Sequence, residues 1–140
     1  MNEDFVPFEL AVKLKEKGFR ELCLAYYTND DTLYYNYSHK AGAIYTDCYL
    51  SHNLMPKDSV SGKFVDAPTI PQVLKWLREE KKIHLMIDIW KVDLNDTTYK
   101  WGYDIVNLTT THVDACDTHC ANSFEEAALA GIEYLLDNLI

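Results

Sequence analysis

Long hydrophobic runs are missing from this sequence of 140 residues. No apolar stretch approaches the ~18 residues that a membrane-spanning helix requires. The first residues are acidic where a secretory signal would be basic, and no apolar segment follows them. We therefore expect a cytoplasmic protein that has no contact with a membrane.

Basic side chains are also scarce, with 13 lysines and arginines against 22 acidic residues and a formal net charge of −9. Such a surface repels phosphate backbones, so we expect no binding to nucleic acid. The one basic cluster is interleaved with Glu79 and Glu80, which is typical of a solvated helix face. It consists of Lys75, Arg78, Lys81 and Lys82.

The sequence has too few glycines and cysteines to predict a phosphate-binding loop or a disulfide framework. The five glycines form no phosphate-binding loop, and the sequence has no G-x-S-x-G or H-E-x-x-H motif. The sequence therefore favours a protein without enzymatic activity and without a cofactor. Four cysteines in a reducing compartment do not predict a disulfide framework, and Cys23 is interpreted as a small buried residue.

Three helices are indicated by apolar periodicity and by their end signals. Residues 7–17 follow helical spacing, with Pro7 in the first turn and Gly18 as the stop. A second helix begins after Thr69 as its N-cap, and a third begins at Ser123, which forms a capping box with Glu126.

Strands are indicated at residues 22–27 and 33–37, and at residues 84–90 and 99–105, each pair forming a hairpin. The segment 38–67 is expected to be irregular, with one short strand around residues 43–50. The predicted fold class is α+β, with an antiparallel sheet of four or five strands and three helices packed on it. The length and the absence of a linker predict a single domain over residues 1–140.

Metal-ligand chemistry is concentrated in one short segment. Cys116, His119 and Cys120 offer two thiolates and an imidazole, which zinc prefers, and His112 or Asp114 could complete a tetrahedron. No second pair of ligands exists elsewhere, because the other cysteines are isolated. The segment is interpreted as a polar loop before the last helix, with a metal site as the alternative.

Two carboxylates, Asp88 and Asp104, lie on the strands of the second predicted hairpin. Both point away from the side chains assigned to the core. Paired carboxylates can perform acid–base chemistry or hold a metal ion. The simpler interpretation is that they are two exposed strand residues.

Tyrosine is the most unusual feature of the composition, with ten residues, of which seven fall between positions 26 and 49. Alternation cannot bury all of these on one face of a sheet. Tyrosine suits protein interfaces and stacking pockets for planar ligands, although it also favours strands in general. The candidate residues for contact with a ligand or partner are Tyr34, Tyr35, Tyr37, Tyr45, Tyr49 and Trp90.

The last predicted helix has an apolar surface that is wider than one stripe, since Leu129, Ile132, Leu136 and Ile140 add to its core face. Such a helix needs cover on more than one side. A second layer of this domain or a second copy of the chain could supply it, and the latter predicts a homo-oligomer.

Three segments resemble a family of short uncharacterised proteins from phages, prophages and mobile elements of gut Bacteroidetes. They are Phe5–Phe19, Ala67–Glu79 and Ser123–Ile132. The resemblance implies a phage or mobile-element origin and a place in the host cytosol, and it supplies no active site. The two strands and the Ser-Phe-Glu-Glu-Ala segment near the end are also similar to HicB-like antitoxin domains.

These observations lead to three hypotheses. The first is a non-enzymatic accessory protein that binds a host protein or its own copies through a tyrosine-rich surface. The second is a protein that sequesters a nucleotide-like small molecule, such as a host immune signal, between aromatic rings. The third is a metal-dependent enzyme that uses Asp88 and Asp104 or the Cys116 segment.

Overall fold

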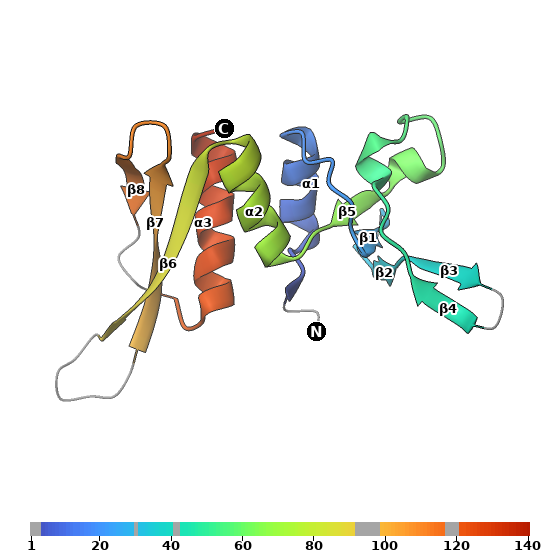
Figure 1. The fold of residues 1–140 in the computed structure, drawn as a ribbon, viewed down its shortest axis with the longest axis horizontal. Helices are drawn as coiled ribbons and strands as arrows, with labels where there is room; N and C mark the ends of the chain where they lie inside the picture. Colours follow the sequence, from blue (N-terminus) through green and yellow to red (C-terminus); the bar gives the residue numbers. More distant parts are fainter. Residues whose placement is uncertain (1–3, 30, 41–42, 92–98, 117–120) are drawn as a thin grey trace. The chain divides into compact units, whose positions relative to one another are not determined.

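A computed structural model describes residues 4–29, 31–40, 43–91, 99–116 and 121–140. The chain divides into two compact units, unit 1 with residues Met1–Thr69 and unit 2 with residues Ile70–Ile140 (Figure 1). Each unit is described by itself. The single domain expected from the sequence stays a prediction.

Unit 1 begins with helix α1, Phe8–Glu16, which ends as its sequence predicts. Gly18 adopts a left-handed backbone conformation with φ 96°. The N–H of Gly18 donates to the carbonyl of Lys15 at 3.2 Å, and the N–H of Phe19 donates to that of Leu14 at 2.9 Å. This pair of bonds is a Schellman motif, and it is completed by the burial of both Leu14 and Phe19.

Two antiparallel sheets follow in unit 1. In the first, β1 (Ala25–Tyr27) is the central strand between β2 (Leu33–Tyr35) and β5 (Val65–Ala67). Helix α1 packs against β5, and the hydroxyl of Tyr27 donates to the carbonyl of Val6 at 2.7 Å. The second sheet pairs β3 (Tyr37–Lys40) with β4 (Ala43–Asp47).

The rest of unit 1 contains two short 3₁₀ turns, η2 (His52–Leu54) and η3 (Ser61–Lys63). Turn η2 packs against β5 and against η3. The segment 38–67, expected to be irregular with one strand, therefore contains two strands and two turns before it reaches β5.

Unit 2 contains α2 (Ile70–Glu80), β6 (Ile83–Lys91), β7 (Tyr99–Asn107), β8 (Val113–Cys116) and α3 (Phe124–Asn138). The strands form one antiparallel sheet in the order β6-β7-β8. The predicted second hairpin corresponds to β6 and β7. Strand β8 was not predicted, because it is short and its pairing with β7 is irregular between Ile105 and Val106.

Helix α3 begins at the predicted N-cap, because the hydroxyl of Ser123 accepts the N–H of Glu126 at 3.1 Å. The reciprocal half of the predicted capping box is shifted by one residue, since the carboxylate of Glu126 accepts the N–H of Asn122 at 3.1 Å. Two backbone donors are satisfied at this helix start.

The wide apolar surface of α3 is covered within unit 2. The helix packs against β7, β6 and α2 (Figure 1). Its buried residues are Ala127, Ala128, Gly131, Ile132, Leu135 and Leu136. A second copy of the chain is therefore not needed to explain the composition of this helix.

The α+β class is confirmed, with three α-helices and antiparallel sheets in the described residues. A single sheet of four or five strands is not confirmed, because the described strands form sheets of three, two and three. Local patterns locate strands but do not determine which strands pair. Among the described residues, no helix has the length and apolar character needed to cross a membrane.

Candidate functional site

The predicted tyrosines of unit 1 fall on two sides of strand β2. Tyr34 stacks on its cross-strand neighbour Tyr26, with ring centroids 5.7 Å apart. Tyr35 contacts Phe5 at 5.8 Å and Tyr37 at 6.3 Å. The structure therefore brings Tyr35 and Tyr37 together and separates them from Tyr34.

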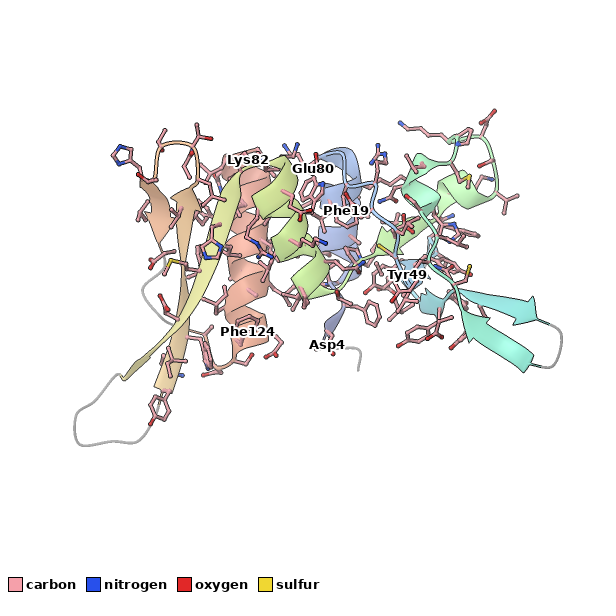
Figure 2. The ribbon with its side chains drawn as sticks, in the orientation of Figure 1. Asp4, Phe19, Tyr49, Glu80, Lys82 and Phe124 are labelled. Carbon is pink, nitrogen blue, oxygen red and sulfur yellow. The ribbon has the colours of Figure 1, made fainter. Side chains whose placement is uncertain are left out.

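Tyr49 lies where the β3–β4 hairpin rejoins the rest of unit 1 (Figure 2). Its side chain is 57% exposed, that of Tyr37 is 56% exposed and that of Tyr34 is 43% exposed. Two exposed aliphatic side chains lie at the backbone bridge between Cys23 and Leu50: that of Leu50 itself and that of Leu22, the residue before Cys23. The side chains of Tyr45 and Trp90 lie outside the described residues.

Asn36 joins the backbone segments that carry these tyrosines. Its N–H donates to the carbonyl of Leu24 at 2.7 Å, and its carbonyl accepts the N–H of Cys48 at 3.1 Å. Its side-chain amide donates to the carbonyl of Cys23 at 2.9 Å. Asn36 is buried, so it ties together the residues next to Tyr35, Tyr37 and Tyr49.

The ring of His52 continues this network. Its Nε2 lies 3.1 Å from Oδ1 of Asn36, and because that oxygen is an acceptor, Nε2 carries the proton. Burial lowers the pKa of His52, although the nearby Asp66 carboxylate opposes this. His52 is therefore neutral at pH 7, and its buried Nδ1 has no hydrogen-bond partner among the described residues.

Asp66 occupies the centre of β5 and is fully buried. Its Oδ2 accepts the N–H of Asn53 at 2.9 Å, and its own N–H donates to the side chain of Asn53 at 3.2 Å. The amide of Asn53 also donates to the carbonyl of Phe19 at 3.0 Å. Turn η2 is thereby held on β5 and on the chain that follows α1. We call Asn36, His52, Asn53 and Asp66 the buried polar network.

Burial raises the pKa of the Asp66 carboxyl, and the hydrogen bonds from the backbone of Asn53 and His52 offset this effect in part. Its second oxygen, Oδ1, is buried without a hydrogen-bond partner in the described part of the chain. Burial lowers the pKa of Lys15 on α1, and the charge of Asp66 opposes this effect. The Lys15 ammonium donates to the carbonyls of Gly62 and Phe64 at 3.1 and 3.0 Å.

Aromatic rings cover one side of the buried polar network. Tyr26 lies 4.6 Å from the ring of His52 and 5.0 Å from that of Phe64, and His52 lies 5.4 Å from Phe64. The stacked pair of Tyr26 and Tyr34 extends this cluster outward to an exposed side chain. The outer tyrosine therefore rests on a packed support.

The thiol of Cys23 lies close to the same network but is unsuited to nucleophilic chemistry. Burial raises its pKa, and the charges of Asp66 and Glu21 raise it further. The Sγ donates to the carbonyl of Glu21 at 3.6 Å. Because the thiolate is the reactive form, this thiol is unreactive, and the burial of Cys23 expected from the sequence is confirmed.

The other predicted site residues are placed only in part. His119 and Cys120 lie outside the described residues, as does the side chain of Cys116 at the end of β8. Asp88 lies opposite Gly102 and Asp104 opposite Met86, so the two carboxylates occupy diagonal positions on one face. Among the described residues, no group of three or more histidine, cysteine or acidic side chains could hold a metal ion.

The basic cluster has the features of a solvated helix face. Lys75 lies 4.0 Å from Glu79 one turn later on α2, and both side chains are largely exposed. The ammonium of Lys81 lies 5.3 Å from the centre of the Trp76 ring. Two of the four cations are therefore engaged with neighbouring side chains of their own unit.

Sequence reasoning missed the buried polar network. Two signals were available: Asn36 is a polar residue within a run of tyrosines, and Asp66 alternates with apolar residues ahead of Pro68. A polar residue inside an apolar or aromatic strand pattern is often buried and hydrogen-bonded.

No protein family, no curated protein and no solved structure matches this chain.

Proposed function

We propose that this chain is a non-enzymatic binding protein, of phage or mobile-element origin, that contacts a protein partner through the exposed tyrosines of unit 1. The tyrosine surface is defined as Tyr37 and Tyr49, whereas Tyr34 lies on the other side of strand β2. Their exposure, 56% for Tyr37 and 57% for Tyr49, is the observation that supports the proposal. Tyrosine is among the residues that contribute most binding energy at protein interfaces.

Rigid support of the tyrosine surface favours binding. Asn36 lies between Tyr35 and Tyr37 in the sequence, and both its backbone and its side chain are hydrogen-bonded. The bond from Cys48 to Asn36 fixes the residue before Tyr49. Side chains on a fixed backbone lose less entropy when a partner binds than those on a mobile loop. The buried polar network therefore serves the binding surface.

Exposed aliphatic side chains extend the tyrosine surface. Leu22 and Leu50 lie at the bridge that also positions Tyr49, and both are exposed. Exposed apolar groups beside tyrosines are typical of the core of an interface. A partner with an apolar patch fits this surface.

Affinity capture from extracts of a bacterial host tests the proposal. The wild-type chain is compared with Tyr37→Ser/Tyr49→Ser, and with Tyr99→Ser as a matched control on a strand of unit 2, where Tyr99 is also 56% exposed. We expect one protein to be retained by wild type and by the control and lost from the double variant. Retention of no protein, or equal retention by all three chains, contradicts the proposal.

The nucleotide hypothesis is separated from this proposal by a thermal-shift screen against mono-, di- and cyclic nucleotides. A binding protein for macromolecules gives no shift. A nucleotide that raises the melting temperature of wild type but not that of the double variant would assign the tyrosines to a small ligand instead.

A further inference from the structure

Strand β6 has a long edge with no strand partner in the part of the chain that the structure describes. It pairs with β7 over its full length, from Ile83 opposite Asn107 to Lys91 opposite Tyr99. It is the first strand of the sheet order β6-β7-β8, so no described strand pairs with its other edge. A nine-residue edge is well beyond the short edges by which proteins avoid further pairing.

The hydrogen bonds of β7 show which backbone groups of β6 face this edge. The backbone of Trp101 exchanges two hydrogen bonds with that of Ala121, and the N–H of Asn107 donates to the carbonyl of His112. The backbone N–H and C=O groups of Trp101 and the N–H of Asn107 therefore point away from β6. The alternate residues of β7 therefore bond to their partners in β6. By the register, those partners are His84, Met86 and Asp88.

It follows that the N–H and C=O groups of Leu85, Ile87 and Ile89 point to the open edge of the sheet. The side chains of this set lie on the helix-covered face, where Leu85 is buried, whereas Ile89 is 49% exposed. Met86, on the opposite face, is 38% exposed. Both partly exposed apolar side chains belong to the strand that lacks a second partner.

The helices of unit 2 pack against β6 and β7. Helix α3 packs against β7 and β6, whereas α2 packs against β6 and α3. Neighbouring helices need about 10 Å each, and neighbouring strands about 4.8 Å, so two helices cover roughly four strands. The sheet has three strands among the described residues, and the helix pair contacts chiefly β6 and β7, on the side of the β6 edge.

We propose that two copies of this chain pair antiparallel through their β6 edges, with a two-fold axis at Met86, to form a continuous six-stranded sheet. This register sets Leu85 opposite Ile87 of the partner subunit on the helix-covered face. On the other face it sets His84 opposite Asp88 of the partner subunit, at non-hydrogen-bonded positions where side chains approach closely.

Charge complementarity selects both the occupant and this register. A two-fold axis at Asp88 would place two carboxylates opposite each other, which is unfavourable. An axis at Ile87 would place Asp88 opposite Met86. The axis at Met86 places the imidazole of His84 opposite the carboxylate of Asp88 at two symmetric positions. It also brings the two exposed Met86 side chains into contact with each other. The strand is therefore complementary to itself.

The pairing is independent of the tyrosine surface, which belongs to unit 1. Sedimentation velocity over a range of concentrations tests it on the full chain. We expect wild type to reach twice the 16.2 kDa chain mass, and Met86→Lys and Met86→Asp each to remain monomeric through like-charge repulsion. An equimolar mixture of these two variants regains the dimer mass, because Lys and Asp then face each other.

Val113→Lys is the matched control, since Val113 is an exposed apolar residue on β8, the other outer strand of the sheet. It keeps the dimer. A monomeric wild type at every concentration, or dimers of both charged variants, overturns the proposal. If the charged variants fail to fold, Met86→Cys replaces them: it forms a disulfide-linked dimer on oxidation, Val113→Cys does not, and absence of the Met86→Cys link also overturns the proposal.

Discussion

Asp66 is a fully buried carboxyl group in the middle of β5. Burial raises its pKa above that of the unfolded chain. A raised folded-state pKa means that the protonated group favours folding below the unfolded pKa, and that this contribution is lost as the pH rises through the folded pKa. Ionised Asp66 therefore lowers stability relative to a neutral residue at this position.

Asp66→Asn removes this titration and keeps an acceptor for the N–H of Asn53. We expect the stability of wild type, relative to that of the variant, to fall as the pH rises from about 4 toward neutrality. Urea unfolding of both proteins at several pH values measures the difference. A difference that is constant over this range, or that changes in the opposite direction, would show that Asp66 is not desolvated as described.

Asn36 holds three segments of unit 1 through its backbone and side chain. Asn36→Ala leaves the buried Nε2 of His52 without its partner and removes one of the two hydrogen bonds to the carbonyl of Cys23, which keeps the bond from the N–H of Leu50. We expect a cost of about 1–3 kcal/mol of unfolding free energy. Asn138→Ala is the control, because Asn138 makes one exposed bond to the carbonyl of Tyr134, and we expect a cost below about 0.5 kcal/mol. Equal costs in urea titrations contradict a structural role for Asn36.

At the scale of single residues, the sequence predicted which side chains are unusual but only part of their surroundings. The tyrosine excess was evident, and Tyr34, Tyr37 and Tyr49 are exposed as expected. The division of Tyr34 and Tyr35 between two sides follows from strand alternation, whereas the stacking of Tyr26 on Phe64 joins residues far apart in the chain. Contacts of that kind depend on which strands pair, and the spacing of apolar residues in the sequence does not reveal this.

Among the elements, the turn beside β5 is sensitive to the size of one residue. A Cβ added to Gly62 would lie 1.7 Å from the carbonyl oxygen of Pro56, which is backbone and cannot rotate away. Gly62→Ala therefore requires the loop to shift and loosens the bond from Lys15 to Gly62. We expect destabilisation of about 2–3 kcal/mol in thermal or urea unfolding.

Gly18→Ala provides the comparison for that variant. Nothing lies within 4 Å of an added Cβ at Gly18, but its φ of +96° strains any other residue. The cost is about 1 kcal/mol and comes from the backbone alone. A larger loss for Gly18→Ala than for Gly62→Ala would contradict the described packing of the turn.

Helix α3 contacts its sheet through Gly131. An added Cβ would lie 2.7 Å from Leu85 and 3.1 Å from the Tyr103 ring. Gly131→Leu therefore separates helix and sheet, with an expected loss of about 1–3 kcal/mol. The neighbouring Ala130 is exposed, so Ala130→Leu is expected to be neutral within about 0.5 kcal/mol. Unfolding curves that do not distinguish the two variants would contradict this packing.

Helix ends were the most predictable elements, because Gly18 and Ser123 act through bonds to residues within five positions. The strands of the second hairpin were predictable for the same reason, since alternation at Tyr99–Asn107 is local. Strand β8 was missed because it has four residues and an irregular register. The short strand predicted around residues 43–50 corresponds to β4, whereas its partner β3 was not predicted.

At the scale of the whole molecule, the α+β class follows from the order of helices and hairpins, but the arrangement of strands in separate sheets does not. Each sheet is completed by a strand distant in sequence or irregular in register, such as β5 beside β1. The predicted excess of apolar surface on α3 was explained by α2 and the sheet. The proposal of a binding protein therefore depends on the tyrosine surface and not on that helix.

The affinity of the purified complex tests the central claim most directly. Isothermal titration of the retained partner is performed with wild type, with Tyr37→Ser/Tyr49→Ser and with Tyr99→Ser. We predict that the double variant raises Kd by at least about 30-fold, corresponding to about 2 kcal/mol for the loss of two interface tyrosines, while the control leaves Kd unchanged. An unchanged Kd for the double variant, with its fold intact by circular dichroism, would contradict the assignment of the exposed tyrosines as the binding surface.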